Sequence, residues 1–162
     1  MRKVLVVDDE FLVRVGIKSF LNWEENGYTI IGEAADGKQA LEIMERELPD
    51  VVLTDLKMDG MDGFELIQVS RKRFPTVQFV VLSSFEDGEN VKRAMKLGAA
   101  DYIFKLTSKP EELLRILNEL PYEQPENEAR LYNLTDSAPD NLYFAVTSGL
   151  IGGGLEEQIT DF

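Results

Sequence analysis

The sequence predicts an α/β protein in which a doubly wound sheet of five parallel strands carries helices on both faces. Three observations predict this fold. Short apolar runs alternate with longer segments of helical periodicity along most of the chain. The runs consist mainly of Val, Ile and Leu with little polar alternation, which is typical of strands buried on both faces. Polar residues follow directly after several runs, and in such sheets the ligand crevice lies beyond the carboxyl ends of the strands.

Each expected strand is short and rich in branched aliphatic or aromatic residues. The five expected strands are Lys3–Val7, Thr29–Ala34, Val51–Thr54, Gln78–Leu82 and Tyr102–Phe104. Right-handed crossovers between consecutive strands place the intervening helices on the faces of the sheet.

Five amphipathic segments separate or follow these strands. The first carries apolar residues at helical spacing from Phe11 to Leu21, and Asp36 is a suitable N-cap for the second. The third opens at Asp62. The fourth is expected to run from Glu86 to Leu97, with Gly98 as its C-cap. The fifth opens at Lys109-Pro110, where proline is tolerated in the first turn.

Composition excludes several classes of function. The chain has 162 residues, 17 basic and 30 acidic, for a net charge of −13, so the chain itself is expected to repel nucleic acid. It has no cysteine and no histidine, which excludes disulfides, thiol catalysis, Ser-His-Asp triads and a histidine base. The apolar run after Met1-Arg2-Lys3 is too short for a signal peptide, and no run is long enough to span a membrane. We therefore expect a cytoplasmic protein without a membrane partner.

The alternating pattern stops near Pro121, so we expect a domain at residues 1–121 and a different segment at 122–162. The second segment has one basic and eight acidic residues, two prolines and a run of three glycines. We interpret it as a linker, a truncated continuation or an added, non-native tail. Leu142–Val146 has the composition of a strand, but no nearby segment is an evident pairing partner.

The polar residues at the strand ends make a chemically coherent set. Asp8 and Asp9 follow the first strand, Asp55 the third, Ser83 the fourth and Lys105 the fifth. If the strands are parallel neighbours, these groups share one crevice. Three crowded carboxylates repel one another unless a cation compensates them, and Mg²⁺ prefers such oxygen ligands. Individually, each group also has a local explanation, because Asp8-Asp9 can cap the following helix, Ser83 can bond locally and Lys105 can be an ordinary surface lysine.

A carboxylate in such a crevice can attack phosphorus to form an acyl phosphate. Lys105 can pair with Asp55 or with a phosphoryl oxygen, and the Ser83 hydroxyl can donate to the same group. Because the chain has no histidine, the phosphoryl donor is expected on a partner protein or a small molecule.

Residues 1–121 resemble the receiver domain of two-component response regulators. Four motifs occur in the family's order: Val6-Val7-Asp8-Asp9-Glu10, Thr54-Asp55-Leu56-Lys57-Met58, Val81-Leu82-Ser83-Ser84, and the run from Gly98 to Lys105. The resemblance implies a flavodoxin-like sheet with strand order 2-1-3-4-5. It also implies a phosphoacceptor that takes its phosphoryl group from a histidine kinase and is not a classical enzyme.

The resemblance also implies residue roles. Asp55 would be the phosphoacceptor, and Asp8, Asp9, Asp55 and the Lys57 main-chain carbonyl would bind Mg²⁺. Ser83 and Lys105 would contact the phosphoryl group. Tyr102 would be the aromatic switch that turns inward when Ser83 moves, biasing the surface of the fourth helix, last strand and fifth helix toward a homodimer or an output partner.

Two positions depart from the family pattern. Asp59 follows Met58 where a proline is usual, and Leu106 follows Lys105 where a cis proline is usual. A Lys-Leu bond strongly prefers trans, so the second departure concerns the path of the loop 106–109 and the reach of Lys105.

The segments 82–87 and 110–114 resemble receivers of AraC-type transcriptional regulators, whose DNA contacts come from a separate helix-turn-helix module. The acidic segment 122–162 has no basic recognition helix, so DNA binding would require an output domain outside this sequence. Two other classes of protein fit the motifs less well. An aspartyl-nucleophile phosphatase needs a second acid at the position of Lys57, and a flavodoxin-like cofactor binder needs a phosphate loop where Asp8-Asp9-Glu10-Phe11 stands.

Overall fold

The computed structural model describes residues 1–84, 86–105 and 107–122, together with the backbone of the short strands at 145–146 and 154–155. Five strands form one sheet: β1 (Arg2–Val7), β2 (Tyr28–Ala34), β3 (Val51–Asp55), β4 (Gln78–Ser83) and β5 (Asp101–Phe104). Their order is β2-β1-β3-β4-β5 and every neighbouring pair is parallel. The predicted α/β fold, its strand number and its strand order are confirmed.

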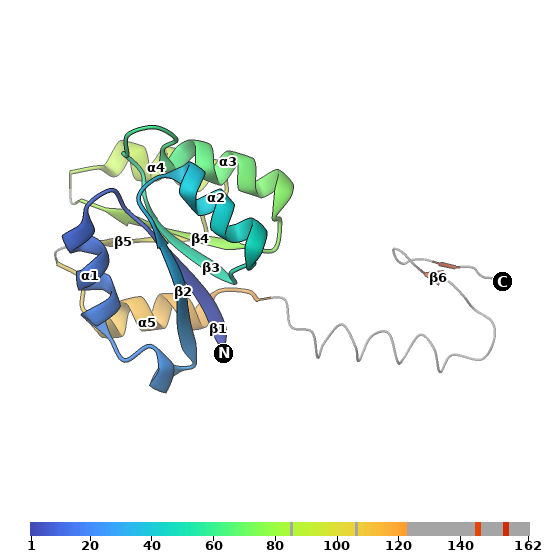
Figure 1. The fold of residues 1–162 in the computed structure, drawn as a ribbon, viewed down its shortest axis with the longest axis horizontal. Helices are drawn as coiled ribbons and strands as arrows, with labels where there is room; N and C mark the ends of the chain where they lie inside the picture. The colour runs from blue at the N-terminus through green and yellow to red at the C-terminus, as the bar shows by residue number, and fades with distance from the viewer. Residues whose placement is uncertain (85, 106, 123–144, 147–153, 156–162) are drawn as a thin grey trace. The chain divides into compact units, whose positions relative to one another are not determined.

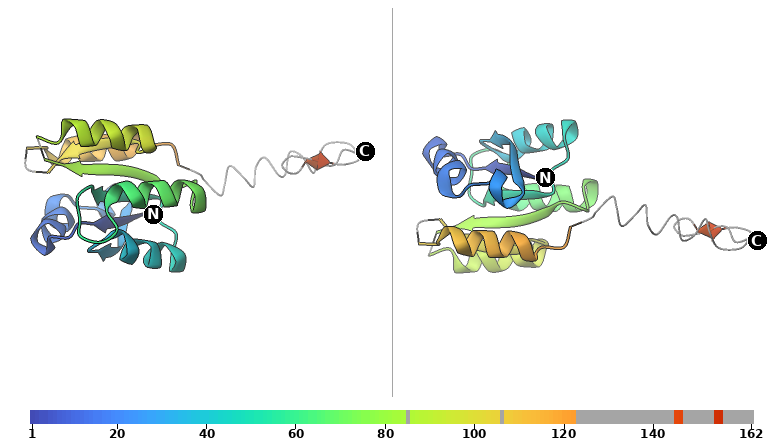
Figure 2. Two further views of the ribbon diagram at one scale, coloured as in Figure 1. Left: turned by 90° about the horizontal axis from the view of Figure 1, so that it is seen from above. Right: turned by 90° about the horizontal axis from the view of Figure 1, so that it is seen from below.

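Five helices cover this sheet: α1 (Phe11–Phe20), α2 (Gly37–Arg46), α3 (Gly63–Arg73), α4 (Gly88–Leu97) and α5 (Pro110–Glu119). Helices α2, α3 and α4 lie on one face, whereas α1 and α5 lie on the other (Figure 1). Figure 2 shows the N-terminal elements in blue on one side of the domain and β4 to α5 in yellow to orange on the other. The chain therefore winds from β1 to the β2 edge, then crosses to β3 and proceeds to the β5 edge.

Alternate residues of each buried strand belong to the two hydrophobic cores. Leu5 and Val7 of β1 pack with Leu66 and Ile67 of α3, on the face that α2, α3 and α4 cover. Val4 and Val6 point to the opposite face, where Leu117 of α5 is fully buried. Burial on both faces explains why the strands read as continuous apolar runs.

The helix ends follow the predicted local chemistry. The Asp36 carboxylate accepts from the main-chain N of Gln39 at 2.9 Å, and the Asp62 carboxylate accepts from that of Glu65 at 3.0 Å. Gly98 ends α4 with a φ of 120°, a conformation that favours glycine. Pro110 occupies the first turn of α5.

Two local features differ from expectation. Helix α4 begins at Gly88 rather than at Glu86, because the Asp87 N–H donates to the Ser84 carbonyl in a turn that precedes the helix. A 3-10 turn, η1 (Glu24–Asn26), connects α1 to β2 and was not predicted. The Trp23 indole before this turn donates to the Ile17 carbonyl at 3.2 Å and is almost fully buried.

Residues 1–122 form one compact unit and residues 123–162 a second. In the second unit, β6 (Ala145–Val146) pairs antiparallel with β7 (Gly154–Leu155), a partner that the sequence did not make evident. Positions 142–144 of the strand expected at Leu142–Val146 lie outside the described residues. The interpretation of 122–162 as linker, continuation or added tail stays a prediction. Among the described residues, no helix is both long and apolar enough to cross a membrane.

Candidate metal and phosphoryl site

The candidate site lies at the carboxyl ends of β1, β3, β4 and β5, where the strand order reverses. Register brings these ends together, because Val7 pairs with Thr54, Asp55 with Leu82, and Ser83 with Phe104. Asp55 and Ser83, the last residues of β3 and β4, therefore lie at the same edge of the sheet as Asp8 and Lys105, which follow β1 and β5. This is the position at which open α/β sheets bind ligands.

Asp8, Asp9 and Asp55 form one carboxylate cluster. Each offers an oxygen, and the three oxygens lie within 4.8 Å of one another. Asp8 is fully buried, Asp55 is mostly buried and Asp9 is exposed. The cluster is therefore open to solvent on the Asp9 side and enclosed beneath.

Asp8 makes one hydrogen bond and one ion pair through its carboxylate. Its Oδ1 accepts from the Glu10 N–H at 2.9 Å just before α1, where Glu10, and not Asp8 or Asp9, occupies the N-cap position. Its Oδ2 lies 2.9 Å from the Lys105 ammonium but has no hydrogen bond of good geometry among the described atoms. The single Lys105 ammonium does not balance the charges of three clustered carboxylates, so the residues present fit a divalent metal.

Lys105 connects Asp8 to Asp55. Its ammonium lies 3.3 Å from Asp55 Oδ2, while Asp55 Oδ1 accepts from the Leu56 N–H at 2.8 Å. The lysine therefore reaches the carboxylates, although Leu106, the departure from the family pattern, lies outside the described residues.

Electrostatics in the cluster favour neutralisation of Asp55. Burial raises the pKa of Asp55, the neighbouring Asp8 charge raises it further, and Lys105 only partly compensates. Burial acts to lower the pKa of Lys105, but the two carboxylates outweigh it and the pKa is raised. Lys105 thus stays charged, and a bound divalent cation would favour the ionised form of Asp55.

The side chains of two other predicted site residues, Ser83 and Lys57, interact with residues outside the carboxylate cluster in the described structure. Ser83 is buried, and its hydroxyl donates to the Ser84 carbonyl at 2.8 Å, the local bond that was the alternative explanation for this residue. Its main-chain carbonyl accepts from the Lys105 N–H at 2.9 Å. The Lys57 side chain points to solvent and its ammonium lies 3.9 Å from Asp87; the metal-binding role of its carbonyl stays a prediction.

Tyr102 lies outside the cluster. Its side chain is 38% exposed, and its ring meets the Phe104 ring edge to face at 5.5 Å. The described structure therefore has the aromatic ring outward, and its proposed inward turn stays a prediction.

Sequence reasoning missed Arg14. Its guanidinium donates to the Asp8 carbonyl at 2.5 Å and to a Glu33 carboxylate oxygen at 2.9 Å, so it ties α1 and β2 to the loop that carries two of the carboxylates. No local signal marks this residue, because an arginine on a helix is usually an ordinary solvated side chain.

Comparison with known proteins identifies the class of domain. Residues 4–118 match the model of the response regulator receiver domain. The chain therefore belongs to the response regulator receiver family, the domain that two-component signalling systems use.

The curated relatives are named as transcriptional regulatory proteins or as response regulators. The chain is 43% identical over 105 residues to the uncharacterized transcriptional regulatory protein YesN of Bacillus subtilis, covering 65% of this chain and 28% of YesN. It is 42% identical over 106 residues to the response regulator VraR of Staphylococcus epidermidis, covering 65% of this chain and 50% of VraR. The chain thus spans half or less of the length of these two relatives.

Solved receiver structures share the fold. The receiver domain of AraT, a response regulator from Geobacillus stearothermophilus, is 28% identical with a TM-score of 0.66, covering 82% of this chain and 97% of that one. The receiver domain of NarL from Mycobacterium tuberculosis is 31% identical with a TM-score of 0.66, covering 73% and 94%.

Proposed function

We propose that this chain is the phosphoacceptor module of a two-component system and that Asp55 is the residue phosphorylated. One observation carries the proposal: Asp8, Asp9 and Lys105 converge on a largely buried Asp55 at the switch point of a receiver fold. No classical enzymatic turnover is proposed beyond the chain's part in its own phosphorylation and dephosphorylation.

The chemistry is a phosphoryl transfer. A carboxylate oxygen of Asp55 attacks phosphorus of a phosphohistidine on a histidine kinase, the P–N bond breaks, and the imidazole of the kinase takes the electron pair. The resulting acyl phosphate is hydrolysed when water later attacks phosphorus. Because the transition state spreads charge over the phosphoryl oxygens, positioning and neutralisation dominate catalysis.

The residues of the crevice divide this work. Asp8, Asp9, Asp55 and the Lys57 carbonyl would hold Mg²⁺, which supplies charge neutralisation at the phosphoryl oxygens when bound. Lys105 sits 2.9 Å from Asp8 and 3.3 Å from Asp55, so its ammonium can move to a phosphoryl oxygen without a change of position of the strand. Ser83 would exchange its bond to the Ser84 carbonyl for one to the phosphoryl group.

The output is a change of surface. When the Ser83 hydroxyl moves toward the phosphoryl group, it leaves room into which the Tyr102 ring turns. This motion alters the α4-β5-α5 face, which would then favour a homodimer or an output partner. Regulation of transcription would follow through a separate output domain, in agreement with the longer relatives.

The test is phosphorylation with acetyl phosphate and Mg²⁺, followed by intact mass. We expect the wild-type chain to gain one hydroxylamine-labile phosphoryl group, and Asp55→Asn to gain none. Asp59→Asn is the matched control, because Asp59 is an exposed acid in the same loop outside the cluster. Equal labelling of Asp55→Asn and wild type would disprove the assignment of the nucleophile.

A further inference from the structure

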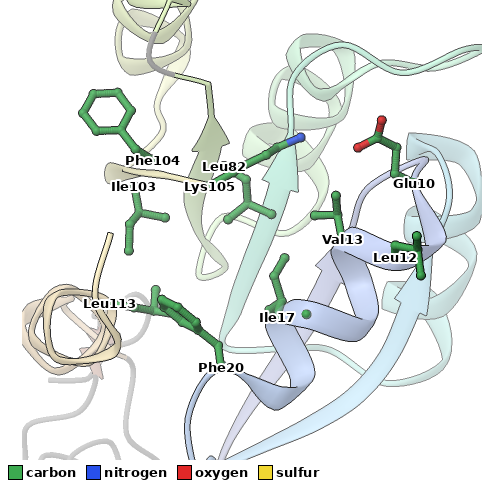
Figure 3. A pocket seen from close by; sticks show the side chains of 11 residues that line it. Glu10, Leu12, Val13, Ile17, Phe20, Leu82, Ile103, Phe104, Lys105 and Leu113 are labelled. Atoms are coloured by element: carbon green, nitrogen blue, oxygen red, sulfur yellow. The ribbon is translucent and has the colours of Figure 1, made fainter. Parts of the chain in front are cut away.

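A cavity next to the carboxylate cluster lies between α1 and α5, over the ends of β4 and β5 (Figure 3). Its volume is about 390 Å³, within the range of about 300–1,000 Å³ that small-molecule sites occupy. Val13 and Ile17 of α1, Leu113 of α5 and the strand residues Leu82 and Ile103 form apolar walls. The last three are buried, so the floor of the cavity is preformed by the core.

Helix α1 carries a glycine beside this cavity. Gly16 lines the cavity, and a Cβ added at Gly16 would meet no atom within 4 Å. Glycine inside a helix costs about 0.5–1 kcal/mol relative to alanine, so the position is not optimised for helix stability. No described residue of α1 is fully buried, and Ile17 and Phe20 are only partly buried against the core.

The polar groups of the cavity gather at one end. Figure 3 shows Glu10 and Lys105 at that end and Phe20 with Leu113 at the other. The Lys105 ammonium is already paired with Asp8 and Asp55, whereas the Glu10 carboxylate is exposed. Among the described residues that line the cavity, Glu10 is therefore the charged group without a salt bridge, and its carboxylate repels an anionic head group and attracts a cationic one.

We propose that the α1–α5 cavity is a binding site for a small amphiphilic amine. The apolar body of the ligand lies between Ile17 and Leu113, and its ammonium lies at the Glu10 carboxylate. Lys105 belongs to the wall of the cavity and to the carboxylate cluster, so the occupied cavity holds the Lys105 stem and changes the affinity of the cluster for Mg²⁺. By thermodynamic linkage, Mg²⁺ changes the affinity for the amine by the same factor.

Binding is tested on the full chain without Mg²⁺, by titration with n-octylamine, n-octanol and octanoate followed by calorimetry and methyl NMR. We expect the amine to bind about threefold more tightly than the alcohol, as an exposed ion pair allows, and octanoate to bind least. Shifts are expected at the methyl groups of Val13, Ile17 and Leu113. In Glu10→Gln, the amine is expected to lose its advantage over the alcohol.

Gly16→Leu is expected to weaken amine binding about tenfold or more, because the leucine side chain would occupy space that the ligand needs. Gly88→Leu is the matched control, since Gly88 is also helical with no atom within 4 Å of an added Cβ and does not line the cavity. Thermal unfolding shows whether both variants are folded. If Gly16→Leu is unfolded, Gly16→Val replaces it in the binding measurement. Unchanged amine affinity in the folded Gly16 variant would overturn the proposal.

Two further outcomes would also overturn the proposal. One is octanoate binding as tightly as the amine. The other is a wild-type protein that sediments as a dimer without ligand, together with a Gly16→Leu variant that sediments as a monomer. That pair of results would mean that a second copy of the chain, and not an amine, occupies the cavity. The binding measurement does not depend on phosphorylation of Asp55, so it can fail while the proposed function stands. Only the coupling to Mg²⁺ rests on the proposed function, and a Mg²⁺ titration with and without the amine tests it.

Discussion

The main-chain oxygen of Asp55 occupies the space that any side chain at Gly63 would need. A Cβ at Gly63 would lie 2.2 Å from that oxygen and 2.8 Å from the Leu56 Cα. The Gly63 N–H donates to the Leu56 carbonyl at 2.9 Å, so the first residue of α3 is hydrogen-bonded to the residue that follows β3. Gly63 is therefore a positioning residue for Asp55, the proposed phosphoacceptor, because it allows α3 to begin in contact with the main chain of Asp55.

Gly63→Ala should destabilise the domain and slow its phosphorylation. The added methyl group meets rigid backbone, and overpacking of this kind costs about 1–3 kcal/mol. Relief of the contact must move Asp55 relative to Lys105, so the rate of labelling by acetyl phosphate should fall more than stability alone explains. Urea unfolding and initial labelling rates measure the two effects.

Gly88→Ala is the control for Gly63→Ala, because an added Cβ there meets no atom within 4 Å and the residue is also at the start of a helix. It should unfold like wild type or slightly later. A Gly63→Ala protein with wild-type stability and labelling rate would show that the Asp55 main chain is free to adjust.

Lys105→Met should make the stability of the domain depend on Mg²⁺. Methionine keeps the apolar stem but leaves the buried Asp8 and the largely buried Asp55 without their ammonium. We expect a loss of about 1–3 kcal/mol without metal, less than for a fully buried pair because Lys105 itself is partly exposed. Mg²⁺ should then raise the melting temperature of Lys105→Met more than that of wild type.

Lys109→Met, at an exposed lysine in the loop before α5, is the control for charge removal alone. Differential scanning calorimetry with EDTA and with Mg²⁺ gives the four melting temperatures. Equal Mg²⁺ shifts in Lys105→Met and wild type would mean that the ammonium does not compete with metal at the cluster.

Glu33→Gln should lower stability at neutral pH but not in acid. The hydrogen bond from Lys18 lowers the pKa of Glu33 below its usual value near 4.5, burial opposes this, and Arg14 lowers it further. A carboxyl group with a lowered folded pKa contributes stability above its unfolded pKa, and this contribution is lost as pH falls through the folded pKa. Since the side chain is partly exposed, the contribution is at most about 1 kcal/mol.

Urea unfolding of wild type and Glu33→Gln at pH 7 and at pH 3 tests this dependence. The difference between the two proteins should be clear at pH 7, shrink below pH 4.5, and decrease with added salt. Glu47→Gln, which removes the acid of an exposed ion pair with Lys3, should show little difference at either pH. A difference that grows toward pH 3 would have the wrong sign.

The parts of the site that could be predicted are those fixed by topology. Asp8, Asp55 and Lys105 each follow an apolar run, and parallel pairing alone places the residues after such runs at one edge. Arg14 and Gly63 could not be predicted, since their importance depends on which main-chain atoms lie opposite them in space. The start of α4 depends on the turn bond between Asp87 and Ser84, and no residue signal distinguishes it from a helix beginning at Glu86.

The orientation of individual side chains is the other feature of the site that the sequence leaves open. Ser83 was expected at the fourth strand end and lies there, but whether its hydroxyl bonds locally or to a ligand is a choice of rotamer, and in this structure it bonds to Ser84. The same holds for Tyr102, whose position in β5 follows from the pattern whereas its outward ring does not. Both orientations are the ones that the proposed switch would change.

Tyr102→Trp should therefore report phosphorylation. The Tyr102 side chain is 38% exposed, so tryptophan at this position should emit as an exposed indole before phosphorylation and shift to the blue when the ring turns inward. Trp23 is only 6% exposed and gives a constant background that the wild-type protein measures under the same treatment. Adding Ser83→Val to Tyr102→Trp removes the hydroxyl and fills the space, so the shift should disappear. Adding the exposed-site change Ser84→Val instead should leave it intact. An unshifted spectrum from Tyr102→Trp protein that intact mass shows to be fully phosphorylated would rule out the inward turn, even if Asp55 is the phosphoacceptor.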